Sequence, residues 1–156
     1  DMSILDNGSI VHLPKIRKGP FIDFARQEEL FRQQEEALHI KMGDRLDLIG
    51  SLSGGNQQKV VLAKWLMSGP KVLILDNPTQ GVDVGAKEEI YTIIHRLAED
   101  GVAVIVLSSE AQEIIRVCDR SLVMFHGHVV GEVAGSEMNE HNIMYLATGG
   151  RQQEGA

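Results

Sequence analysis

The sequence has few of the residues that mark secreted or nucleic-acid-binding proteins. Its single cysteine, Cys118, excludes an internal disulfide and fits a reducing compartment. Aromatic residues make up only 4% of the 156 residues, so surfaces that stack nucleic-acid bases are not expected. The net charge of −7 points the same way, because nucleic acid favours a basic face. No nucleic-acid partner is therefore predicted.

Long apolar runs are also missing. The longest, at residues 72–75 and 102–107, are far too short to cross a bilayer. The N-terminus lacks the basic and then apolar pattern of a signal peptide, and it begins at Asp1, which suggests a fragment or an engineered start. A hydrophobic content of 43% is ordinary for a globular chain of this size, which can bury one core and a small lobe.

The first 69 residues are predicted to be mainly helical. Residues 1–19 contain the turn signals Asn7-Gly8 and Gly19-Pro20. A helix is expected from residue 21 to about residue 39, with an apolar stripe, and a polar loop follows it. The stripe consists of Phe24, Phe31 and Leu38. A second helix is expected from Ser53 to Met67, and its predicted apolar face consists of Gln58, Val61, Leu62, Trp65 and Leu66.

After residue 70 the pattern alternates between strands and helices. Residues 72–75 and 102–107 are continuous apolar runs, typical of strands covered on both faces. Helices are expected before Gly101, at about residues 111–118 and at residues 139–147, and a hairpin is expected at residues 121–133. This alternation predicts an α/β fold. The predicted division is a helical part at 1–69, a core lobe at 70–150 and a tail at 151–156.

Residues 52–58 read Leu-Ser-Gly-Gly-Asn-Gln-Gln and open the second predicted helix. Gly54 and Gly55 allow backbone N–H groups to approach an anion, the helix dipole favours that anion, and the Ser53 hydroxyl adds a donor. The alternative is a glycine loop in which Ser53 only caps the helix. The flanking residues favour the phosphate interpretation; they are Leu52, Asn56, Gln57, Gln58 and Lys59.

A complete phosphate-binding loop with its lysine occurs nowhere in the sequence. Gly50 and Gly55 have the spacing of that loop, but Asn56 and Gln57 stand where Lys and Ser or Thr are required.

Asp76 ends the first predicted strand, where open α/β sheets bind ligands. A carboxylate there can hold Mg²⁺ through water beside nucleotide phosphates. The alternative is an aspartate that caps a turn. The turn-rich segment after it, residues 78–85, is well placed to touch a neighbouring molecule.

Together these segments resemble ATP-binding cassette proteins. Residues 52–58 resemble their signature, residues 73–79 their Walker B strand, and residues 81–83, which include Asp83, their D-loop. Residues 81–87, 108–110, 119–124 and 143–150 are similar to importers of ribose, xylose and related sugars, in which two cassettes are fused. The resemblance covers residues 1–150 and implies the back half of the second cassette: part of a P-loop NTPase fold with a parallel-strand core and a helical signature subdomain.

The sequence departs from that family's pattern in its catalytic positions. The Walker A loop and the Gln loop are missing, Asn77 replaces the usual Glu, and Ser109 replaces the usual switch His. An amide cannot accept a proton from water, and serine substitutes poorly for imidazole. The resemblance therefore implies a degenerate site of its own and an intact signature that completes the ATP site of a partner cassette, with the isolated chain inactive.

The same resemblance implies ATP and Mg²⁺ as cofactors. It implies a first cassette and membrane permease subunits as partners, a sugar-binding protein as an indirect partner, and a peripheral position at the cytoplasmic face of the membrane. Two alternatives remain: a head lobe of a chromosome-maintenance or DNA-repair ATPase, which would need long heptad helices before the signature, and a docking module without catalysis, which Asn77 favours.

Several other residues are interpreted as structural. The pair His126 and His128 is expected at an exposed hairpin tip, while Cys118 and Trp65 are expected to pack in the core. The glutamates at 28, 29, 35 and 36 are expected on a solvated helix face.

Overall fold

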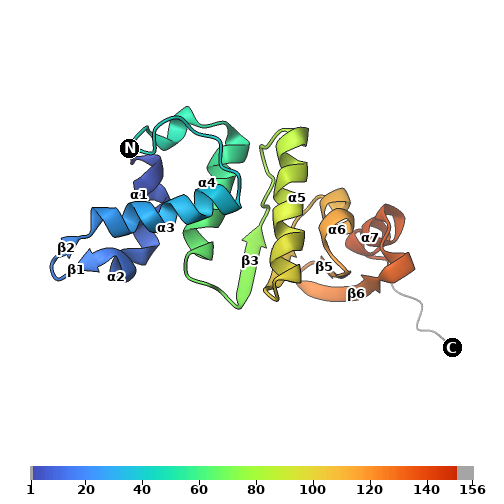
Figure 1. Ribbon diagram of the computed structural model, residues 1–156. Helices are drawn as coiled ribbons and strands as arrows, with labels where there is room; N and C mark the ends of the chain where they lie inside the picture. Colours follow the sequence, from blue (N-terminus) through green and yellow to red (C-terminus); the bar gives the residue numbers. More distant parts are fainter. Residues whose placement is uncertain (1, 151–156) are drawn as a thin grey trace. The chain divides into compact units, whose positions relative to one another are not determined.

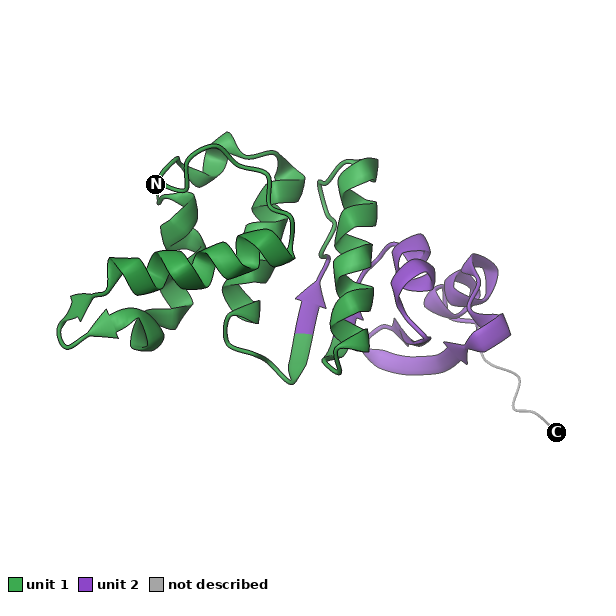
Figure 2. Ribbon diagram, in the orientation of Figure 1, with its two compact units in different colours: residues 1–73, 78–104 green, residues 74–77, 105–156 purple. Residues whose placement is uncertain are grey.

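The computed structural model describes residues 2–150, and their contacts divide the chain into two compact units. The first comprises residues 1–73 and 78–104, and the second comprises residues 74–77 and 105–156 (Figures 1 and 2). The predicted tail at 151–156 lies outside the described residues. The predicted division at residues 69 and 70 concerns subdomains of a larger fold, and it stays a prediction.

The first unit is mainly helical and packs around a small apolar centre that includes Ile4, Phe31 and Leu62, none of them more than 1% exposed. A hairpin of two short strands connects α2 to α3, and Ser3 and Asp23 cap α1 and α3 by accepting hydrogen bonds from backbone N–H groups. Its elements are α1 (Ile4–Ser9), a 3-10 turn (Ile10–His12), α2 (Leu13–Ile16), β1 (Arg17–Lys18), β2 (Phe21–Ile22), α3 (Phe24–Ala37), a 3-10 turn (Ile49–Ser51), α4 (Gly54–Leu66) and α5 (Val84–Glu99).

Strands β3 (Val72–Asp76) and β4 (Ala103–Leu107) pair with each other. The backbone bonds from residue 103 to 71 and from residue 77 to 107 advance in the same direction along both strands, so the pair is parallel. The prediction of two covered faces is wrong: Val72 is 54% exposed and Ile74 64%, whereas Leu73 and Leu75 are buried. The side chains alternate between the faces, and no described residue covers the second face.

The second unit has its own core between a β-hairpin and two helices. It contains α6 (Ala111–Val117), β5 (Arg120–Phe125), β6 (His128–Ala134), a 3-10 turn (Gly135–Glu137) and α7 (Glu140–Ala147). Its buried core consists of Ile114, Val123, Val133, Ile143 and Leu146. The hairpin turn at His126 and Gly127 has positive φ at both residues, 47° and 80°, as the favoured two-residue turn requires. The predicted hairpin and helices of this region are confirmed.

Two predictions about the N-terminal region are wrong. The Asn7-Gly8 turn signal lies inside α1, because Gly8 is the close-packing point for Phe31: a Cβ on Gly8 would overlap the Phe31 ring. Tertiary packing therefore overrides the local signal. The next helix begins at Phe24 rather than at Phe21. Phe24 is 70% exposed, so only two residues of the predicted stripe are buried: Phe31 in α3 and Leu38, the residue that follows α3.

The bounds of α4 match the prediction, but its buried face does not. Val61 and Trp65 are exposed, so the predicted packing of Trp65 is wrong. Leu62 is buried as predicted, and the other buried residues are Gly55, Lys59, Val60 and Ala63. The charged residue of this set, Lys59, forms an ion pair with Glu89 of α5.

Candidate functional site

The N-terminus of α4 differs from the other long helix starts in the first unit. Ser53 precedes α4 in an extended conformation, yet its side chain makes no capping hydrogen bond. Its Oγ instead accepts a hydrogen bond of 3.0 Å from Nδ2 of Asn56. The interpretation of Ser53 as a simple cap is therefore wrong, and the backbone donors of the first turn are not used by it. Uncapped donors at the positive end of a 13-residue helix suit an anion.

The two signature glycines have different surroundings. A Cβ on Gly55 would lie 2.4 Å from Cβ of Ala86, so this buried glycine is required for the close packing of α4 on α5. A Cβ on Gly54 would lie 3.5 Å from the carbonyl oxygen of Gly81, an ordinary contact, and Gly54 is exposed. Packing therefore explains Gly55 but leaves the glycine at position 54 unexplained, and only Gly54 is free to face a ligand.

Polar contacts fix the first turns of α4. The Asn56 Oδ1 accepts a hydrogen bond of 2.8 Å from the backbone N–H of Lys41, and Gln57 Nε2 donates to the carbonyl oxygen of Leu52 at 2.8 Å. Both side chains are thereby committed to neighbouring backbone. They hold the preceding loop against the helix rather than pointing a free amide outward.

The buried Lys59 connects α4 to α5. Its side chain is 3% exposed, and its Nζ lies 2.7 Å from Oε2 of Glu89 and donates to the carbonyl oxygen of His39 at 3.0 Å. The hydrogen bond from Lys59 lowers the pKa of Glu89 below its usual value. Sequence analysis did not predict this pair. The position of Lys59 next to the apolar residues Val60, Leu62 and Ala63 of the same helix could have indicated a buried lysine.

Helix α5 begins beside α4, since Gly55 meets Ala86 and Lys59 meets Glu89 one turn later in each helix. Here the cap is complete: Oδ1 of Asp83 accepts a hydrogen bond of 3.0 Å from the backbone N–H of Ala86. The predicted D-loop residue therefore has a structural task at the start of α5.

The other predicted site residues lie in the second unit. Asp76 ends β3 and is exposed, and its Oδ1 accepts a hydrogen bond of 2.8 Å from Nδ2 of Asn77. Asn77 has a φ of 46° and is bonded through its N–H to the carbonyl oxygen of Leu107. Asparagine adopts this left-handed conformation more readily than most residues. Ser109 is exposed in the segment after β4.

One carboxylate can hold Mg²⁺ only together with water and phosphate oxygens. Within residues 2–150, no group of three or more His, Cys, Asp or Glu side chains is arranged to hold a metal ion. Asp76 fits the role of a single carboxylate beside a nucleotide, and its assignment remains a prediction.

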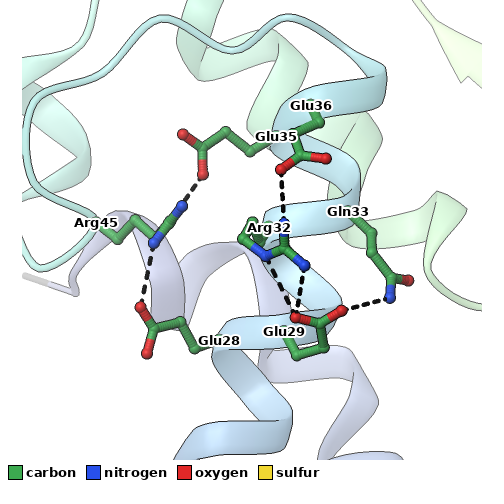
Figure 3. A network of polar contacts seen from close by, with 7 residues as sticks. All are labelled: Glu28, Glu29, Arg32, Gln33, Glu35, Glu36 and Arg45. Carbon is green, nitrogen blue, oxygen red and sulfur yellow. Dashed lines mark hydrogen bonds and ion pairs between the residues drawn. The ribbon is translucent and has the colours of Figure 1, made fainter.

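Two arginines form ion pairs with the four glutamates on the acidic face of α3 (Figure 3). Arg32 bonds to Glu29 and Glu36 along the helix, and Arg45 reaches from the following loop to Glu28 and Glu35. These carboxylates are exposed or half-buried, as predicted, and the contacts with Arg32 lower the pKa of Glu29.

The remaining interpretations agree with the structure. His126 and His128 are exposed at the hairpin tip, and Cys118 packs against the core of the second unit. Burial raises the pKa of the Cys118 thiol, so it is a poor nucleophile. None of the helices among the described residues has the length and apolar character needed to cross a membrane.

Comparison with known proteins places these features in a family. The ABC transporter family matches residues 3–80. The chain is 47% identical over 150 residues to the ribose import ATP-binding protein of Halalkalibacterium halodurans, and 48% identical over 151 residues to that of Lactococcus lactis subsp. lactis. These matches cover 96% and 97% of this chain but only 30% and 31% of the relatives. The chain thus spans about a third of the length of the curated relatives it matches.

Solved structures show the same fold. A nucleotide-free ATP-binding cassette from an ABC transporter aligns with a TM-score of 0.74 at 23% identity, covering 92% of this chain and 59% of that chain. The cassette MJ1267 aligns with a TM-score of 0.71 at 22% identity, covering 96% and 60%. The predicted fold class, part of an ABC cassette, is confirmed.

Proposed function

Because the chain belongs to the ABC transporter family, we propose that it supplies the signature half of a composite ATP site in the ATPase of a sugar importer. The observation that carries the proposal is the open N-terminus of α4, where Ser53 leaves the first-turn donors uncapped. The names of the relatives support ribose or a similar sugar as the cargo. The partners would be the first cassette, in the same or a partner chain, membrane permease subunits and, through them, a sugar-binding protein at the membrane.

The residues of α4 suit the terminal phosphate of an ATP that is held mainly by the partner cassette. Backbone N–H groups at Gly54 and Gly55 and the Ser53 hydroxyl would donate to its oxygens, and the α4 dipole would add to their effect. The missing side chain at Gly54 allows the close approach. The contacts of Lys59 and Asn56 keep these donors in place before the partner arrives, which reduces the ordering cost of closure.

The strand-end residues form the other, weaker half of the proposal. Asp76 would hold Mg²⁺ through water in a second nucleotide site, but that site would lack a general base because Asn77 and Ser109 replace Glu and His. ATP bound at that site would therefore turn over slowly. The chain would activate its partner's site while its own remains idle. The Walker A loop is not among these 156 residues, so another segment must provide it.

The exposed face of β3 and β4 fits a larger assembly. Val72, Ile74, Ile105 and Leu107 are all exposed apolar side chains on the strand pair. Further strands or helices of a complete cassette would cover them. The 156-residue chain alone should self-associate and should bind ATP no more tightly than millimolar. Light scattering and calorimetry with Mg-ATP would check both points, and a monomer with sub-millimolar affinity would contradict the proposal.

The test restores the missing groups in the protein assembled with its partner cassette. Asn77→Glu combined with Ser109→His should raise ATP turnover by about 10²–10⁴-fold when the base of the partner site has been removed. Asn77→Gln with Ser109→His is the matched control, because it keeps an amide at position 77 and should gain nothing. Equal turnover in the wild type and the restored variant would refute the assignment of an idle site.

The docking-module alternative makes a different prediction. Asn77 favours it, since it removes the base, and a docking module would leave ATP turnover insensitive to changes at Ser53 and Gly54. The DNA-ATPase alternative is less well supported, because among the described residues the longest helix before α4 is the 14-residue α3, which is not a long heptad helix.

A further inference from the structure

The hairpin formed by β1 and β2 has an apolar tip that is exposed to solvent. Phe21 is 75% exposed, Phe24, just after the hairpin, is 70% exposed, and Ile22 between them is 42% exposed. Exposing two of the chain's four phenylalanines within four residues costs free energy in water. The nearby Phe31 is fully buried, so this region buries one phenylalanine and leaves the other two exposed.

The same segment carries a charge opposite to that of the rest of the chain. Residues 13–26 contain four basic residues, Lys15, Arg17, Lys18 and Arg26, and one acidic residue, Asp23, which gives a charge of +3. Since the whole chain carries −7, the other residues carry −10. Asp23 is engaged as the cap of α3, while Arg17 and Lys18 form no ion pair within the described residues.

The strand register places cations beside the apolar side chains. Lys18 lies opposite Phe21, and Arg17 lies opposite Ile22. Residues that lie directly opposite each other share a face, so each face of the hairpin carries one cation and one apolar side chain. Gly19, with a φ of 64°, makes the tight turn, and the bond from the Asp23 N–H to the carbonyl oxygen of Ile16 closes the base. The hairpin protrudes beyond the start of α3 (Figure 1).

We propose that this hairpin tip inserts into a membrane surface that bears anionic lipid headgroups. Phe21 and Phe24 would enter the boundary between headgroups and acyl chains, and Arg17 and Lys18 would contact the lipid phosphates. A lipid surface can deform around a protruding tip and cover both phenylalanines. An acidic polypeptide could cover both only if it offered a groove of matching shape. Two hollows in the described surface, one near Arg45 and Asp44 and one near Gln57 and Lys64, are not lined by residues of this hairpin.

The proposal goes beyond the nucleotide site, since it uses none of its residues, and it is tested without ATP. The purified protein would be floated with vesicles of phosphatidylcholine alone or mixed with phosphatidylglycerol, at low and high salt. We expect binding to the mixed vesicles only, and weaker binding at high salt. Arg17→Gln with Lys18→Gln should weaken binding roughly tenfold or more. Phe21→Ser with Phe24→Ser should weaken it at least tenfold.

Val129→Ser is the matched control, because Val129 is an exposed apolar residue, 59% exposed, outside the β1–β2 hairpin, and this change should leave salt-dependent binding unaltered. Circular dichroism would establish that the hairpin variants fold. Equal binding to neutral and anionic vesicles would overturn the proposal, as would wild-type binding by both hairpin variants. Retention by polyglutamate with no binding to vesicles would also overturn it, and would indicate an acidic protein partner instead.

Discussion

The helices α4 and α5 begin side by side, and their first turns are completed in opposite ways. At α5 the Asp83 carboxylate accepts from the N–H of Ala86, so the helix end satisfies its own donor. At α4 the Ser53 hydroxyl is bonded to the side chain of Asn56, and the first-turn donors receive nothing from it. A self-capped start serves the fold. An uncapped start leaves polar groups that a ligand can use.

The two adjacent glycines of α4 repeat this contrast within one turn. Gly55 has no room for a Cβ because of Ala86, whereas Gly54 has room and faces outward. One glycine is thus required by packing and the other is consistent with close approach of a ligand. Substitutions can separate these roles, because they should affect stability at one position and activity at the other.

The largest expected effect concerns Gly54 and Asp76. In the assembled protein, Gly54→Asp should lower steady-state ATP hydrolysis by about 10²–10³-fold or more, because it would place a carboxylate against the phosphate of the proposed composite site. Asp76→Asn should retain much of the turnover, since under the proposal it would weaken Mg²⁺ binding only at the idle site. ATPase assays and sugar uptake would measure both variants.

Gly54→Ala is the control for size, since its Cβ makes only an ordinary contact with Gly81 and adds no charge. It should lose less activity than Gly54→Asp. If Asp76→Asn abolished turnover and Gly54→Asp preserved it, the active and idle sites would be reversed.

The next effect concerns the ion pair that fastens α4 to α5. Glu89→Gln should lower the free energy of unfolding by about 2–3 kcal/mol, because it leaves the buried Lys59 ammonium without its counter-charge. Lys59→Met should cost less, about 1–2 kcal/mol, since Glu89 is half-exposed and can be solvated. Urea unfolding followed by the fluorescence of Trp65, the only tryptophan, would measure both.

The pair also predicts a dependence on pH. The pKa of Glu89 is lowered by its hydrogen bond with Lys59 in the folded protein, so the stabilisation is fully present above the pKa of Glu89 in the unfolded chain and is lost as pH falls through the lower folded value. Glu89→Gln should remove this part of the acid sensitivity. A variant with the wild-type pH profile would show that the pair adds nothing to stability.

A smaller effect is expected from Gly55→Ala. The new Cβ would overlap Ala86, and the strain should outweigh the gain in helix propensity, leaving a net loss of about 1–2 kcal/mol. Ala86→Gly should restore part of that loss in the double variant, which a separate effect at each position would not do. Gly54→Ala should be neutral or slightly stabilising in the same unfolding assay.

Local sequence patterns predicted the turns and helix ends that depend on residues close together in the sequence. The turn at His126 and Gly127 and the end of α5 at Gly101 follow from turn and capping preferences, and the predicted bounds of α4 match the structure. The motif order was sufficient to predict the ABC cassette fold, which the solved structures confirm. The roles of Asp76, Asn77 and Ser109 stay predictions.

The failures arose where a residue's partner is distant in sequence. Gly8 lies in a helix against the Phe31 ring, and the buried face of α4 includes Lys59, whose partner Glu89 is 30 residues away in the sequence. The covered faces of β3 were expected from an apolar run, but Ile74 is exposed because no described residue covers it. The missing cap of Ser53 could not be predicted either. Its hydroxyl can accept from a backbone N–H or from the Asn56 side chain, and the sequence does not show which of the two it bonds to.

The smallest effect tests the comparison of the two helix starts directly. Asp83→Ala removes a cap and should lower the free energy of unfolding by about 1 kcal/mol. Ser53→Ala removes no cap, and only its exposed bond to Asn56 is lost, so its effect should stay within about 0.5 kcal/mol. The order should reverse in the ATPase assay of the assembled protein if the Ser53 hydroxyl contacts phosphate, because Ser53→Ala then loses a donor in the active site. Asp83→Asn is the matched control, since its side-chain oxygen can still cap α5 and should preserve stability. Equal losses of stability at positions 53 and 83 would mean that Ser53 caps α4 in solution, and the open helix end would then no longer support a phosphate site.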